Sequence, residues 1–421
     1  MSIYGRSRAL GAVVGAGAFL LLGALAGPLG SAHVATDGLA STSSSTILVD
    51  DNHVQCPTAL YTTIQAAVAA APAGSTIKVC PGTYQGPVVI TEALTIVGPK
   101  GVAQQRNPGD SKHQAIVIGG ASGDGFTLGS GSSGTTINGF VVTGGAQPLF
   151  DAGINVTDSA GTGYTILNNL IINNNVGMYF HSTGGQVSRI EGNAFENNTA
   201  GGFPTPNSGS GIFTQLSTIN DTTITGNFFS GQTDSDLNLG ASAGGLVITK
   251  NQTKNDTTFL VLGNATGAVV SGNTVQAPVQ GSAMYIFGGN SSVQITNNHL
   301  VASAAEAATG SSGIRLTQNF GATTGNTGMT ISGNTITGYD YGIRGADIVS
   351  STLKGNKVGH AGVDGIGFDN TTSGNTLTNN NASKSGTFDC HDTSTGPGTA
   401  GTANTWINDD GKKASPPAIC D

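Results

Sequence analysis

The sequence predicts an all-β protein built as a parallel β-helix, a solenoid of about ten short coils. Of the 421 residues, 66 are glycine and only 10% are charged, whereas soluble domains usually carry about 25% charge. Gly, Ser, Thr and Asn dominate, and all four are poor helix formers. Short apolar-alternating runs recur along the chain, and one segment alone, residues 62–71, has helical periodicity.

The recurring runs end in asparagine at intervals that are mostly 22 to 25 residues. Leucine-rich repeats share this period but need a leucine ladder, and WD40 blades are about twice as long. Coils of a β-helix lie about 4.8 Å apart, so equivalent residues stack, and stacked Asn side chains hydrogen-bond along the ladder. We therefore interpret these asparagines as structural. They are Asn169, Asn193, Asn227, Asn251, Asn273, Asn298, Asn334, Asn356 and Asn375.

Residues 1–32 have the pattern of a secretory signal, with Arg6 and Arg8, an apolar run and the small residues 30–32 at the cleavage point. An uncleaved anchor is the alternative, because the apolar run is long. Cleavage would leave 14 basic and 24 acidic residues, a charge of −10. This charge argues against nucleic acid and anionic membranes as partners. Residues 33–45 are predicted to be a Ser/Thr-rich linker.

Export makes disulfides expected for the four cysteines, which allow three pairings. The local pairing, Cys56 with Cys80 and Cys390 with Cys420, is the economical choice. We expect residues 46–100 to form an N-terminal cap with the first coils, 101–381 the β-helix and 382–421 a disulfide-bonded C-terminal cap. In the cap helix, Ile64, Ala67, Val68 and Ala71 would share one face. The cysteines and histidines do not have the spacing that is typical of a zinc site. No cofactor is expected; calcium stays open, without a recognisable site.

A column of outward-facing positions follows the strand alternation. It places Tyr285, Arg315 and Arg344 on three successive coils, and two adjacent arginines repel each other unless an anion lies between them. The alternative is neutralisation by nearby carboxylates at Asp340, Asp347 or Asp369.

A second outward patch gathers Tyr179, His181, Phe213 and Gln215, and Phe287 lies near Tyr285 in the same face. An exposed histidine on a β-face is the plain alternative. Three stretches exceed the repeat length: 197–211, 302–313 and 318–328. These inserts would wall a groove or form simple loops.

The segment "YTTIQAAVAAAPAGSTIKVCPGTYQGPVVITEALTIVG" (61–98) resembles the entry segment of the right-handed parallel β-helix, or pectin-lyase-like, superfamily. It is also similar to the front of pectin methylesterases. The resemblance implies a single-stranded right-handed parallel β-helix in a secreted bacterial protein. The catalytic motifs of the methylesterases, pectate lyases, polygalacturonases and mannuronan epimerases are absent; "WIND" (406–409) and "GIGFDN" (365–370) match two of them only partly.

These observations lead to two functional hypotheses. The first is a secreted, monomeric protein that binds or cleaves an extracellular acidic polysaccharide. Arg315 and Tyr285 would form the catalytic pair of a lyase, with Arg344 on the substrate carboxylate. Tyr179, His181, Phe213, Gln215 and Phe287 would add substrate contacts. The second is a non-catalytic β-helix module of a cell surface or matrix. In both, neither nucleic acid nor, after signal removal, a membrane is a partner.

Overall fold

The computed structural model describes residues 46–105, 109–120, 123–145, 151–159, 161–199, 209–214, 217–256, 258–276, 281–302, 309–318 and 325–421. The chain divides into a unit of residues 1–41 and a unit of residues 42–421. The predicted signal segment and linker therefore lie outside the described residues. Among those described, no helix has the length and apolar character needed to cross a membrane.

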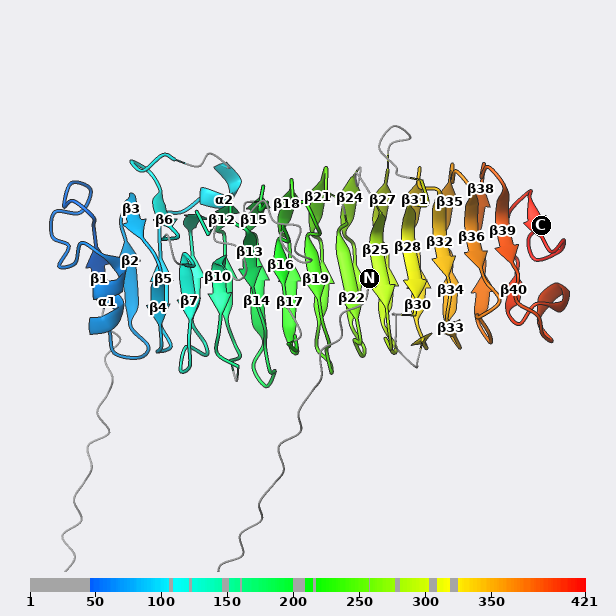
Figure 1. The fold of residues 1–421 in the computed structure, drawn as a ribbon, viewed down its shortest axis with the longest axis horizontal. Helices are drawn as coiled ribbons and strands as arrows, with labels where there is room; N and C mark the ends of the chain where they lie inside the picture. The colour runs from blue at the N-terminus through cyan, green and yellow to red at the C-terminus, as the bar shows by residue number, and fades with distance from the viewer. Residues whose placement is uncertain are drawn as a thin grey trace, which may run out of the picture. The chain divides into compact units, whose positions relative to one another are not determined.

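Three long parallel sheets make up the fold, and each coil except those at the ends contributes one strand to each sheet (Figure 1). Sheet A has 14 strands: β1 (Thr46–Val49), β2 (Thr76–Val79), β5 (Thr95–Val97), β8 (Thr136–Asn138), β11 (Thr165–Leu167), β14 (Ser188–Glu191), β17 (Thr222–Thr225), β20 (Val247–Thr249), β23 (Val269–Ser271), β26 (Gln294–Thr296), β30 (Thr330–Ser332), β34 (Thr352–Lys354), β37 (Thr376–Thr378) and β40 (Thr405–Ile407).

Sheet B has 12 strands: β3 (Gly82–Gln85), β6 (Ala115–Ile118), β9 (Phe140–Thr143), β12 (Leu170–Ile172), β15 (Ala194–Glu196), β18 (Phe228–Ser230), β21 (Gln252–Lys254), β24 (Thr274–Gln276), β27 (His299–Val301), β31 (Thr335–Thr337), β35 (Lys357–Gly359) and β38 (Asn381–Ser383).

Sheet C has 13 strands: β4 (Val88–Ile90), β7 (Phe126–Leu128), β10 (Ala152–Val156), β13 (Val176–Tyr179), β16 (Ile212–Phe213), β19 (Leu237–Leu239), β22 (Leu260–Gly263), β25 (Ser282–Phe287), β28 (Ser312–Thr317), β32 (Tyr341–Gly345), β36 (Asp364–Phe368), β39 (Phe388–Asp392) and β41 (Ala414–Ser415). A two-stranded sheet joins β29 (Asn326–Thr327) to β33 (Ile348–Val349).

The predicted parallel β-helix is thus confirmed, with more coils than the ten expected. The extra coils come from both ends of the chain, where the asparagine repeat does not mark them. At the C-terminal end, β39, β40 and β41 lie within residues 382–421 and continue sheets C and A. The C-terminal segment is therefore strand-forming and extends the sheets as well as covering their end.

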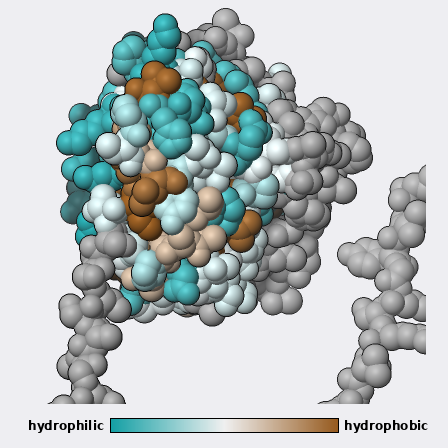
Figure 2. All heavy atoms as spheres, turned by 90° about the vertical axis from the view of Figure 1, so that its left-hand side faces the viewer, coloured by the Kyte–Doolittle hydropathy of each residue, from teal (hydrophilic) through white to brown (hydrophobic). Residues whose placement is uncertain are grey.

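The cap helix α1 (Ile64–Ala70) begins after Thr63, whose hydroxyl accepts a hydrogen bond from the Ala66 amide. Its predicted apolar face is confirmed, since Ile64, Ala67, Val68 and Ala71 are all buried. Figure 2 views this end of the molecule, where apolar residues are scattered among hydrophilic ones. A second short helix, α2 (Val102–Gln105), was not predicted and packs against β9. Both predicted disulfides, Cys56–Cys80 and Cys390–Cys420, are present.

The interior asparagine ladder runs from Asn169 through Asn356, with each side-chain amide donating to the oxygen of the next. It then continues to Asn380 and ends at Asp409. Asn375, the last predicted member, belongs to a separate ladder that leads to Asn404. Because every rung donates toward the C-terminal end, the last rung only has to accept, and a carboxylate such as that of Asp409 suits this position.

Candidate functional site

The predicted outward column is present on sheet C. Tyr285 of β25 is the register partner of Arg315 on β28, and Arg315 is the partner of Arg344 on β32. The strand alternation turns their inward neighbours, such as Met284 and Ile314, into the core. The three side chains therefore lie on successive coils about 4.8 Å apart.

Aromatic rings hold the two guanidinium groups. The Arg315 Cζ atom lies 5.2 Å from the ring centre of Tyr285, and the Arg344 Cζ atom lies 4.6 Å from that of Tyr341. Such contacts are attractive because the ring face is electron-rich. Tyr285 in turn stacks on Phe287, with ring centres 5.5 Å apart.

Neither guanidinium makes an ion pair with a carboxylate in the part of the chain that the structure describes. Two of the carboxylates suggested as neutralising partners serve local turns instead. Asp340 accepts a hydrogen bond from the Gly310 amide, and Asp369 accepts one from the Thr371 amide at 2.9 Å. Both guanidinium groups thus lie at the surface of sheet C without an ion-pair partner among the described residues.

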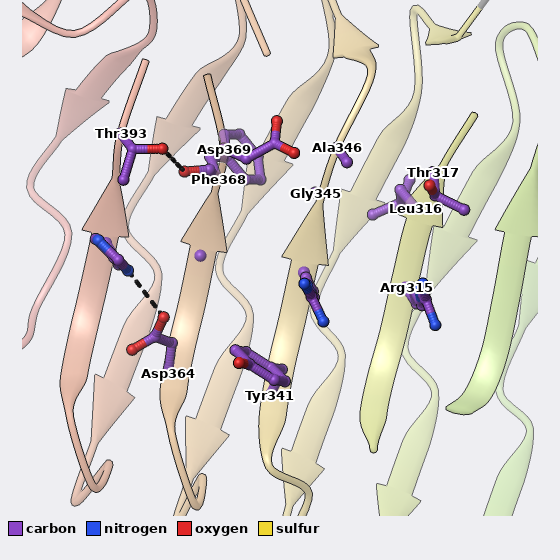
Figure 3. A pocket seen from close by; sticks show the side chains of 13 residues that line it. Arg315, Leu316, Thr317, Tyr341, Gly345, Ala346, Asp364, Phe368, Asp369 and Thr393 are labelled. Carbon is purple, nitrogen blue, oxygen red and sulfur yellow. Dashed lines mark hydrogen bonds and ion pairs between the residues drawn. The ribbon is translucent and has the colours of Figure 1, made fainter. Parts of the chain in front are cut away.

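A hollow of about 280 Å³ opens beside the arginines on the C-terminal side (Figure 3). Its floor includes Gly367, which lies in register between Arg344 and His391. A side chain at position 367 would project into the hollow; a Cβ atom there would meet nothing closer than Asp364 Oδ2, at 3.5 Å. The lining residues are Arg315, Leu316, Thr317, Tyr341, Arg344, Gly345, Ala346, Asp364, Gly367, Phe368, Asp369, His391 and Thr393.

The far wall of the hollow carries a histidine–carboxylate pair. His391 Nδ1 lies 2.8 Å from Asp364 Oδ2; the His391 side chain is 27% exposed and that of Asp364 only 8%. The Phe388 ring packs against the imidazole, with centres 4.6 Å apart. When Nδ1 donates its proton to the buried carboxylate, Nε2 keeps its lone pair free to accept a proton.

His391 belongs to the run "DCHD" (389–392) on β39, whose other three residues anchor the last coils. Asp389 accepts hydrogen bonds from the backbone amides of Ser385, Lys412 and Lys413. Cys390 forms the C-terminal disulfide. Asp392 accepts from the side chains of Ser394, Asn404 and Trp406. His391 is thus held from both sides by buried, bonded neighbours.

Sequence analysis missed His391, Asp364 and Tyr341. A usable signal existed, because Cys390 is the inward partner of Ile366 and His391 is therefore the outward residue of the next coil. The sequence marks Cys390 most clearly as half of a disulfide, and this role conceals its place in the strand alternation.

The second predicted patch also forms a hollow, of about 290 Å³, that brings together Tyr179, His181 and Phe213. The rings of Tyr179 and Phe213 meet edge to face at 5.5 Å. Burial, with the nearby Asp124 and Asp151, raises the pKa of Tyr179 to about 12. The His181 ring Nε2 contacts the backbone oxygen of Asp158.

This second hollow lies six strands of sheet C away from Arg344. Gln215, the fourth predicted member of the patch, falls outside the described residues. Most of the three long inserts also lies outside them, so the expected groove wall stays a prediction. In the described part of the chain, no three His, Cys, Asp or Glu side chains are close enough together to hold a metal ion.

The family described as the right handed beta helix region matches residues 152–320. The three all-parallel sheets show the fold class, a parallel β-helix, as the front segment suggested, and this family match over part of the chain agrees with it. No curated protein matches the sequence.

Several solved structures are similar to this chain. An alginate lyase from Paenibacillus sp. str. FPU-7 is 15% identical, over 79% of this chain and 95% of its own, with a TM-score of 0.40. Tailspike protein 3 of bacteriophage CBA120 is 15% identical over 84% and 58%, with a TM-score of 0.45. DFA-IIIase from Arthrobacter chlorophenolicus A6 is 16% identical over 73% and 84%, with a TM-score of 0.43.

Proposed function

We propose that this protein binds an acidic polysaccharide outside the cell and transfers protons at a uronate unit seated in the hollow beside Arg344. The observation that carries the proposal is that two arginines without ion-pair partners among the described residues and a histidine–carboxylate pair line one small hollow. A uronate supplies the complement: a carboxylate for the guanidinium groups and an acidic C–H bond for the base.

The arginines support an anionic ligand for an electrostatic reason. Arg315 and Arg344 are direct neighbours in the register, and like charges at that position disfavour the fold. A carboxylate between them would turn the repulsion into two charge-assisted hydrogen bonds, which are roughly twice as strong as neutral ones. Their aromatic supports, Tyr285 and Tyr341, keep both guanidinium groups in place before the ligand arrives.

His391 is the better placed base. A guanidinium keeps its proton in proteins, whereas an imidazole exchanges its proton near neutral pH. In the proposed reaction, His391 Nε2 removes the proton on the carbon next to the uronate carboxylate. Negative charge then develops on that carboxylate, where Arg344 and Arg315 stabilise it.

The intermediate can continue in two ways. If the glycosidic oxygen leaves with a proton from a nearby acid, the chain is cleaved by elimination. If a proton returns to the other face of the carbon, the sugar is inverted. The Tyr341 hydroxyl is a candidate proton carrier for either step, because Tyr341 lines the hollow and is the register partner of Asp364.

The earlier assignment of Arg315 and Tyr285 as the catalytic pair stays a prediction. Tyr285 does not line the hollow, and its ring contacts Arg315 from the preceding coil. On this basis we propose that Arg315 and Arg344 bind the carboxylate, and that His391 with Asp364 takes the catalytic role. The patch of Tyr179, His181 and Phe213 would contact a distant part of the same long chain.

The test is a screen of pectate, alginate and glycosaminoglycans with the wild-type protein and the His391→Gln variant. Ultraviolet absorbance detects the unsaturated uronate produced by elimination, and proton exchange into the polymer from D₂O detects inversion. Binding without either signal, unchanged in His391→Gln, would instead support the non-catalytic surface or matrix module. Absence of binding to every acidic polymer would reject the proposal.

A further inference from the structure

The loop that follows the first strand carries a set of buried oxygen atoms without hydrogen-bond donors. Asp50 Oδ1, Asp51 Oδ1 and Gln55 Oε1 are all inaccessible to solvent and make no hydrogen bond. Asp50 is 0% exposed as a whole residue. A buried acceptor without a donor costs about 1–3 kcal/mol, and more when it is charged, so three of them in six residues require an explanation.

Backbone amides hold the two carboxylates of this loop in place. Asp50 Oδ2 accepts a hydrogen bond from the Cys56 amide at 2.6 Å, which places Gln55 beside Asp50. Asp51 is the covalent neighbour of Asp50, and its Oδ2 accepts a bond from the Thr83 amide at 2.8 Å. Each carboxylate thus has one oxygen fixed by the backbone and a second oxygen left over.

The surroundings fix the carboxylates further. A Cβ atom at position 82 would lie 2.7 Å from Asp51 Oδ1, so a glycine there makes room for that carboxylate. Tyr84, two residues after Gly82, is buried, and its hydroxyl donates a hydrogen bond to the Cys80 carbonyl. The Cys56–Cys80 disulfide crosses this region as well.

We propose that a calcium ion binds in this loop through Asp50 Oδ1, Asp51 Oδ1 and Gln55 Oε1, and ties the N-terminal cap to the first coil. Two carboxylates and an amide oxygen are hard ligands of the kind Ca²⁺ accepts, whereas zinc sites favour nitrogen and sulfur. Backbone carbonyls and water would complete the six to eight ligands that calcium takes. This proposal is independent of the proposed function, because the cap lies at the far end of sheet C from Arg344.

Calcium binding to the full chain is measured by isothermal titration calorimetry with Ca²⁺ alone, after treatment with EDTA. We expect one ion per chain at an affinity within the range of extracellular modules, about 10⁻⁴–10⁻³ M, or tighter. The unfolding temperature should rise by about 2 °C or more at saturating Ca²⁺. Mg²⁺ at the same concentration should produce a smaller rise, because it demands stricter octahedral geometry.

The Gln55→Met variant distinguishes a loop that binds a cation from a loop that does not. If no cation binds, removing a buried oxygen that lacks a donor should leave stability unchanged or increase it. If calcium binds, Gln55→Met should weaken Ca²⁺ binding by about tenfold and reduce the thermal shift, because one ligand is lost. Asp51→Asn, which keeps an oxygen for the Thr83 amide, should weaken binding further. Asp221→Asn is the matched control, since Asp221 caps an unrelated turn at the Gly185 amide.

Two results would overturn the proposal. One is an absence of Ca²⁺ binding to the wild-type chain with no change in its unfolding temperature. The other is a Ca²⁺ affinity and a thermal shift that are the same in Gln55→Met and Asp51→Asn as in the wild type. Binding of acidic polysaccharides is an independent measurement, and Gln55→Met should leave it unchanged. The calcium site can therefore be rejected while the proposed function stands, and the reverse also holds.

Discussion

Arg315 and Arg344 are direct register partners on β28 and β32, and each guanidinium rests on a tyrosine ring and not on a carboxylate. Aromatic support orients a cation without neutralising it. The fold therefore keeps two positive charges side by side and available. We attribute this arrangement to a ligand that carries the opposite charge.

Replacing one of these arginines should separate binding from stability. Arg344→Gln should weaken binding of an acidic polysaccharide about tenfold or more, because a charge-assisted hydrogen bond contributes about 1.5–3 kcal/mol. The same change should leave the unfolding free energy unchanged or raise it by a few tenths of a kcal/mol, because it relieves repulsion. Affinity electrophoresis and urea unfolding measure the two effects.

Arg189→Gln is the control, because Arg189 is exposed on β14 of sheet A, away from the hollow. It changes the net charge equally. If Arg189→Gln weakened binding as much as Arg344→Gln, the attraction would come from overall charge and the hollow would have no special role.

Filling the hollow should block the site without damaging the fold. The Gly367→Val side chain would enter the space between Arg344 and His391, and its Cβ would meet Asp364 Oδ2 at an ordinary 3.5 Å. We expect loss of polysaccharide binding with the circular dichroism spectrum unchanged. Gly359→Val is the matched control, because position 359 of β35 is equally open, with Thr337 Oγ1 at 4.0 Å. Tight binding by Gly367→Val would place the ligand elsewhere.

Replacing the histidine should lower turnover, whereas replacing an arginine should weaken binding of the polymer. His391→Gln should reduce turnover by about 100-fold or more, the usual contribution of a general base, while Kd for the polymer changes little. Asp364→Asn should also lower turnover and shift the pH profile, because the imidazole loses its orienting carboxylate. An unchanged turnover in His391→Gln would remove this residue from the chemistry and return attention to Arg315 and Tyr285.

The sequence predicted most of the fold because the repeat is local. Apolar alternation and the recurring asparagines were sufficient to place Tyr285, Arg315 and Arg344 on one column. The remaining half of the site could not be recognised in the same way. His391 lies on β39, beyond the last asparagine that was assigned to the ladder, and its contact with Asp364 spans 27 residues.

The hollow itself also escaped sequence analysis. It depends on the absence of a side chain at Gly367 between two long neighbours, and 66 glycines offer no way to single this one out. The cap loop illustrates the same limit, because unpaired oxygens at Asp50, Asp51 and Gln55 are visible only once the backbone donors have been assigned.

An interior carboxyl group should make stability depend on pH. Asp236 is fully buried beside Asp256, and burial, followed by the charge of Asp256, raises its pKa well above the usual value. An acid with a raised folded pKa stabilises the fold below its unfolded pKa of about 3.9, and this contribution is lost as the pH rises through the folded value.

Asp236→Asn removes that titration. Relative to the variant, the wild type should therefore lose unfolding free energy as the pH rises from about 4 through the raised pKa of Asp236. Urea unfolding of both proteins across this range measures the difference. Parallel stability curves would show that Asp236 titrates alike in the folded and unfolded chains.

In the asparagine ladder each side chain donates a hydrogen bond toward the C-terminal end, and mutations at its two kinds of position should have different costs. Asn298→Asp removes two donors, to the Val270 carbonyl and to Asn334 Oδ1, and should cost about 3 kcal/mol or more. Asp409→Asn, at the accepting end, loses only the bond from the Ile407 amide and should cost about 1 kcal/mol. Equal costs in urea unfolding would contradict a directional ladder.

The most direct test of the proposed site is a comparison of wild type and Arg344→Gln by calorimetric titration with one acidic polysaccharide at two salt concentrations. We predict that the wild type binds, that its affinity falls as salt rises, and that Arg344→Gln loses about tenfold in affinity together with part of the salt dependence. Equal binding by the two proteins, or no binding by the wild type to pectate, alginate or any glycosaminoglycan, would contradict an anionic-glycan site beside Arg344.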